Sequence, residues 1–109
     1  SPDYALARFN LANICEETGR VEEATTEYEE AIRIHPAYAD AHYNLALVYE
    51  RVGEPMRAVK HWRIYLRLDP HSPWAGIARQ QVDSLVDVRP GGAKRTASQS
   101  GPLPSKIGE

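Results

Sequence analysis

The sequence has little of what marks several large protein classes. Its single cysteine, Cys15, rules out a disulfide within the chain, and we expect a reducing, cytoplasmic compartment. The apolar runs are only a few residues long, far short of the ~20 residues that cross a bilayer. No basic-then-apolar leader opens the chain. We therefore expect no disulfide scaffold, no membrane insertion and no secretory signal.

The chain also lacks a strong excess of one charge. Its 13 Lys and Arg stand against 15 Asp and Glu, a net charge of −2. Residues 1–38 hold 8 acids against 3 Arg, residues 39–73 hold 4 acids against 5 bases, and residues 74–109 hold 3 against 5. No stretch clusters the cations that neutralise a phosphate backbone. Nucleic acid is not expected as a partner of this segment.

Patterns typical of catalysis are missing as well. None of the four histidines has a metal-ligand spacing with Cys15 or with paired acids. There is no serine elbow, no glycine-rich phosphate loop and no HExxH motif. We expect a non-enzymatic chain with no catalytic residues, no metal and no cofactor.

What the sequence does contain is an internal period of 34 residues. Residues 5–38 and 39–72, superimposed without a gap, share 10 identities, most of them at small, turn or apolar positions. The matched pairs include Leu11 and Leu45, Ala12 and Ala46, Gly19 and Gly53, Ala24 and Ala58, and Pro36 and Pro70. With 42% apolar residues, the chain has enough apolar side chain to bury a core.

Each unit predicts two helices. Apolar residues recur at helical spacing from residue 5 to a stop at Gly19, and again over 21–34. Pro36 then blocks continuation. The second unit predicts helices over 39–52 and 55–68, with Pro55 suited to a first turn. A fifth helix is expected over 73–88, and residues 89–109, rich in Gly, Pro and Ser, predict a disordered tail or linker.

The period resembles the tetratricopeptide repeat (TPR). Its small-and-large signature is met by Leu11, Ala12, Gly19, Ala24, Tyr28, Ala31 and Pro36, and then by Leu45, Ala46, Tyr49, Gly53, Ala58, Trp62 and Pro70. The resemblance implies an all-α, antiparallel helix-hairpin solenoid. Residues 1–88 would form the domain, from units 5–38 and 39–72 and a capping helix 73–88. Tyr65 departs from the family pattern, which usually has a small residue there.

The resemblance also implies a binding surface. In this family, the first helix of each pair lines a concave groove that receives a peptide or partner helix. The register places twelve residues there: Leu6, Phe9, Asn10, Asn13, Asp40, Tyr43, Asn44, Leu47, Arg51, Trp74, Ile77 and Gln81. Asparagine amides both donate and accept, which suits them to the backbone of an extended ligand. The cations with which some members hold a terminal carboxylate are replaced, so a receptor for chaperone tails is not expected.

We therefore expect a non-catalytic scaffold for protein–protein interaction, whose groove binds a peptide or partner helix. One alternative is a regulatory or oligomerisation segment of a larger bacterial protein, such as a DNA-binding regulator or enzyme. Another is a structural module that forms a homo-oligomer. Each groove residue could instead serve only to tie neighbouring helices together or to fill the core.

Overall fold

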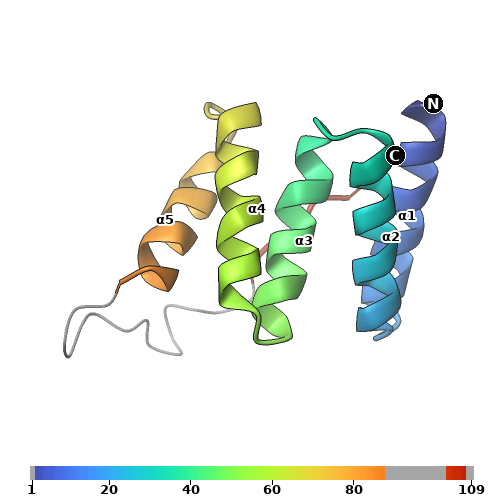
Figure 1. Cartoon of the computed structure of the whole chain (residues 1–109), viewed down its shortest axis with the longest axis horizontal. Helices are drawn as coiled ribbons and strands as arrows, with labels where there is room; N and C mark the ends of the chain where they lie inside the picture. Colours follow the sequence, from blue (N-terminus) through green and yellow to red (C-terminus); the bar gives the residue numbers. More distant parts are fainter. Residues whose placement is uncertain (1, 88–102, 108–109) are drawn as a thin grey trace.

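The computed structural model describes residues 2–87 and 103–107, and Figure 1 shows its helices side by side in chain order. The helices in this described part are α1 (Pro2–Glu17), α2 (Val21–Ile34), α3 (Ala39–Arg51), α4 (Pro55–Leu68) and α5 (Ala75–Leu85). Helix α1 packs against α2 to form the first hairpin, and α3 packs against α4 to form the second. The two hairpins contact each other through α2 and α3, and α5 packs against α4. The predicted all-α hairpin solenoid is confirmed.

One glycine follows the first helix of each pair, Gly19 after α1 and Gly53 after α3. Gly19 has φ +79° and Gly53 has φ +81°, the left-handed conformation that side chains disfavour. After α1, the Gly19 N–H donates to the Glu16 carbonyl and the Arg20 N–H to the Cys15 carbonyl, at 3.1 and 2.8 Å. This pair of bonds satisfies carbonyls that the helix end leaves free. The same pattern follows α3, so both hairpins turn alike.

Small and large residues alternate where the helices cross. Ala12 and Ala24 in the first hairpin are fully buried, as are Ala46 and Ala58 in the second. They allow close approach of the paired helices. Large aromatic side chains fill the space that remains, and both Tyr28 and its 34-residue counterpart Trp62 have no exposed surface. The repeat in the sequence is therefore a repeat in packing.

The repeat breaks down in one respect. Leu45 is fully buried, whereas Leu11, 34 residues earlier, is 40% exposed. Helix α2 lies beside α3, and no helix of the described chain takes the corresponding place beside α1. The difference in burial thus reflects the missing neighbour, since both leucines occupy the same register.

The fifth helix is shorter than expected. It begins at Ala75 because residues 70–74 form turns, and it ends at Leu85. Its inner face buries Ala75 and Ala78. The last residue of the predicted capping helix, position 88, lies outside the described residues.

Candidate functional site

A short C-terminal segment, residues 103–107, has no regular secondary structure and runs past α3 and toward α1 (Figure 1). Lys106 is only 9% exposed, and Leu103 packs against the core cluster. These five residues belong to the stretch 89–109, which the sequence predicts to be a disordered tail or linker. The rest of the stretch 89–109 lies outside the described residues. The segment contacts several of the predicted groove residues.

Asn44 on α3 holds the backbone of this segment at two points. Its Nδ2 donates to the Lys106 carbonyl oxygen at 2.7 Å, and its Oδ1 accepts from the Lys106 N–H at 2.7 Å. The same Nδ2 lies 3.0 Å from Asn13 Oδ1 on α1, which orients the amide. Asn44 is fully buried. A fixed amide that satisfies both backbone groups of one residue can bind an extended chain without reading its side chain.

Tyr43, the preceding residue, adds a third backbone contact. Its hydroxyl donates to the Pro104 carbonyl oxygen at 2.9 Å. Burial of the ring, followed by the nearby Tyr65 and Glu50, raises the pKa of the Tyr43 hydroxyl. The phenol therefore keeps its proton at neutral pH and remains a donor.

The Lys106 side chain enters a pocket of aromatic rings closed by a carboxylate. Its Nζ lies 2.7 Å from Asp40 Oδ1. The same nitrogen is 5.7 Å from the ring centre of Tyr43, 4.9 Å from that of Tyr65 and 5.2 Å from that of Trp74. Burial lowers the pKa of Lys106, but hydrogen bonds with Asp40 and Tyr65 outweigh it, and the net pKa is raised. Lys106 stays charged in a site that compensates its desolvation.

The rings of this pocket hold one another in place. Tyr43 meets Tyr65 and Trp74 edge-on, with centroids 5.2 and 5.5 Å away. The Tyr65 hydroxyl lies 2.6 Å from Ser72 Oγ, which also accepts a hydrogen bond from the backbone N–H of Trp74 at 3.2 Å. Tyr65 was not among the predicted groove residues. One feature of the sequence pointed to Tyr65, which is its large side chain at a position where the family usually has a small one.

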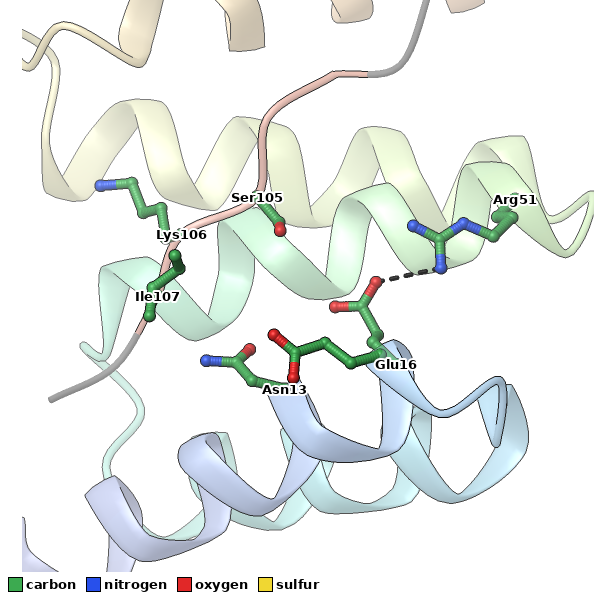
Figure 2. A pocket seen from close by; sticks show the side chains of 7 residues that line it. Asn13, Glu16, Arg51, Ser105, Lys106 and Ile107 are labelled. Carbon is green, nitrogen blue, oxygen red and sulfur yellow. Dashed lines mark ion pairs between the residues drawn. The ribbon is translucent and has the colours of Figure 1, made fainter.

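Beside the segment lies a small pocket between α1 and α3, shown in Figure 2, with a volume of about 200 Å³. It is lined by Asn13, Glu16, Glu17, Arg51, Ser105, Lys106 and Ile107. Arg51 pairs with Glu16 across the two helices at 3.1 Å. Asn13 Nδ2 is buried and has no hydrogen-bond partner among the described residues. The pocket thus offers a donor and charges of both signs next to the bound segment.

The other predicted groove residues fall into two groups. Leu6, Asn10 and Ile77 keep part of their surface exposed, and Leu47 is nearly covered. Phe9 is fully buried between Tyr28 and Tyr38, while Gln81 donates to the Glu50 carboxylate at 2.8 Å. Phe9 and Gln81 therefore belong to the packed interior. The prediction placed them in the groove because register alone gives the helix face and not the depth of burial.

The remaining reactive side chains form no metal site in the described part of the chain. Cys15 is a buried free thiol. Among the described residues, no cluster of three or more His, Cys, Asp or Glu is arranged to hold a metal ion. Within that same part, none of the helices has the length and apolarity needed to cross a bilayer.

Comparison with known proteins agrees with the architecture. A family model described as "TPR repeat" matches residues 12–53, from the middle of α1 to the turn after α3. A search of curated protein sequences gave no match to the chain. The 34-residue period, the stacked helix hairpins and the family match over residues 12–53 together support a tetratricopeptide repeat protein.

Proposed function

We propose that this chain is a non-catalytic scaffold whose concave groove binds an extended segment of a protein partner in a reducing, cytoplasmic compartment. TPR repeats generally mediate protein–protein interaction, and domains of this family are typically non-catalytic. The observation that carries the proposal is the two-point contact between Asn44 and the backbone of Lys106. An amide fixed in this way accepts any extended peptide whose side chains fit the surrounding walls.

The walls of the groove support the same function. Tyr43 supplies a further backbone donor, and the pocket beside Arg51 leaves room next to the bound segment. Ser105 and Ile107 remain exposed, so the groove contacts the segment mainly through its backbone and through two side chains, those of Leu103 and Lys106. A partner needs only a short extended stretch to use these contacts.

In a chain whose residues 103–107 are kept out of the groove by Lys106→Glu, Asn44→Ala is expected to weaken binding of a labelled peptide with the sequence of residues 100–109 about tenfold or more. The variant removes both backbone hydrogen bonds and leaves the peptide groups of the bound residue without partners. Fluorescence polarisation with the full chain measures the affinity, and far-UV circular dichroism checks helicity. Gln80→Ala, an exposed amide on α5, is the matched control. Equal affinity of the Asn44→Ala variant and the control would remove the groove from the proposal.

A second function, self-association into a homo-oligomer, is favoured by one exposed surface. Tyr4, Leu11 and Ile14 lie along one face of α1 and are 69%, 40% and 49% exposed. Leu45 and Val48, the counterparts of Leu11 and Ile14 on α3, are fully buried. Because the register is the same, the face of α1 has the chemistry to be covered by an amphipathic helix of a second copy.

Leu11→Glu combined with Ile14→Glu is expected to raise the dissociation constant of such an oligomer at least tenfold. Two carboxylates would have to be buried without partners at the interface. Sedimentation velocity over a range of concentrations measures the change. Met56→Glu, which alters an exposed apolar residue on α4, should leave the association unchanged. A wild-type chain that stays monomeric at every concentration would eliminate this second function.

A further inference from the structure

We propose that the pocket formed by Asp40, Tyr43, Tyr65 and Trp74 selects a lysine in the bound segment, and that residues 103–107 are the resident ligand a partner must displace. The inference rests on the proposed function, because it names the peptide class that the same groove takes. The selection of lysine adds a side-chain requirement to the contact between Asn44 and the peptide backbone.

The pocket matches an ammonium group in both charge and shape. Three ring faces lie within 4.9–5.7 Å of Nζ, inside the ~6 Å range over which a cation is attracted to an aromatic ring. Asp40 Oδ1 accepts a charge-assisted hydrogen bond at 2.7 Å. An uncharged side chain of similar length would leave Asp40 without this partner. The ring faces would then gain no cation contact.

The hydrogen bond to Asp40 also requires a hydrogen on the nitrogen. A primary ammonium supplies it, whereas a trimethylated lysine keeps its charge but has no N–H to donate. The 2.7 Å separation leaves no space for a methyl group between nitrogen and oxygen. The pocket therefore favours unmodified lysine, although its rings alone would accept either form.

A second buried position completes the recognition pattern. Leu103 packs against the core cluster three residues before Lys106, while Pro104 and Ser105 between them are exposed. The partner class is thus an extended segment with an apolar residue three positions before a lysine.

Occupation by the chain's own segment makes binding competitive. A partner peptide has to displace Lys106 from Asp40 and from Asn44 before it can use the same atoms. Lys106→Glu in the full chain should release the resident segment, because it sets a carboxylate against that of Asp40. The groove then becomes free while the rest of the chain is unchanged.

The test titrates labelled peptides into the full chain and follows fluorescence polarisation. The peptide with the sequence of residues 100–109 should bind the Lys106→Glu chain about tenfold more tightly than the wild-type chain. Against the Lys106→Glu chain, a peptide with methionine in place of the lysine should bind about 10–100-fold more weakly. A trimethyl-lysine peptide should lose about tenfold.

A matched pair of chain variants assigns the effect to the pocket. Asp40→Asn, introduced together with Lys106→Glu, should weaken the lysine peptide about tenfold. Asp83→Asn makes the same chemical change on the exposed side of α5 and should have no effect. Circular dichroism confirms that each variant keeps its helices.

The outcomes separate this inference from the proposed function. Equal binding of the lysine and methionine peptides would overturn the selectivity and leave peptide binding in place. Equal affinity of the wild-type and Lys106→Glu chains would overturn the role of residues 103–107 as a resident ligand. A complete lack of binding by every peptide to the Lys106→Glu chain would overturn both proposals.

Discussion

Trp62→Ala is expected to lower the free energy of unfolding by about 3–5 kcal/mol, the range for deleting a large aromatic side chain from a packed core. Trp62 has no exposed surface and meets Tyr43 edge-on, with ring centroids 4.9 Å apart. Its indole N–H donates to Glu50 at 2.7 Å, on the carboxylate that also accepts from Gln81. The substitution opens a cavity between α3 and α4 and removes one of the donors to Glu50.

Urea unfolding followed by far-UV circular dichroism measures this loss, since tryptophan fluorescence changes with the substitution itself. Trp62→Phe separates the two causes, because phenylalanine fills most of the space and lacks only the N–H donor. We expect it to lose about 1–3 kcal/mol. A loss below about 1 kcal/mol for Trp62→Ala would mean that the second hairpin is not held by this side chain.

Acidification from pH 6.5 to pH 4 is expected to destabilise the chain by roughly 3 kcal/mol through one buried histidine pair. His42 Nδ1 and His61 Nδ1 lie 2.9 Å apart, and both side chains are buried. His42 Nε2 donates to the Pro36 carbonyl, 2.9 Å away, because a carbonyl can only accept. Neutral His42 then accepts at Nδ1, and His61 Nδ1 carries the shared hydrogen.

The direction of this pH effect follows from the pKa values. Burial first, then His42, Lys60 and Arg57, lowers the pKa of His61 from 6.5 to about 4. Burial also lowers the pKa of His42. Between pH 6.5 and 4 the unfolded chain therefore binds protons that the folded chain excludes. Stability is complete above pH 6.5 and is lost as the pH falls through this window.

His61→Gln is the variant that checks this. A glutamine amide can still donate to His42 Nδ1, but it does not titrate, so the fall in stability over this window should shrink to about half or less. Urea unfolding at several pH values provides the comparison. Carboxylates titrate in both chains and cancel in the difference. Parallel pH profiles for the two chains would show that the histidine pair does not control the acid response.

The sequence already contained most of the fold and half of the site. The 34-residue period gave the helix pairs, because glycine and proline at fixed intervals dictate local backbone geometry whatever surrounds them. Asn44 and Tyr43 were predicted as groove residues because register follows directly from that period. The register did not predict how deeply these two side chains are buried or which atoms they contact. Phe9 and Gln81 share the predicted helix face, yet Phe9 packs against Tyr28 and Tyr38 and Gln81 donates to Glu50.

The tertiary structure alone revealed the lysine pocket. Asp40, Tyr65 and Trp74 belong to three different parts of the repeat, and Lys106 lies 66 residues beyond Asp40. The register placed Asp40, Tyr43 and Trp74 in the predicted groove, but it did not link Tyr65 or Lys106 to them. That proximity depends on how α5 packs on α4 and on where residues 103–107 cross α3. By itself, the sequence determined the repeated helices, because local backbone preferences recur with the period. Long-range packing decided which of the repeated positions contact residues 103–107 and which of them surround the Lys106 side chain.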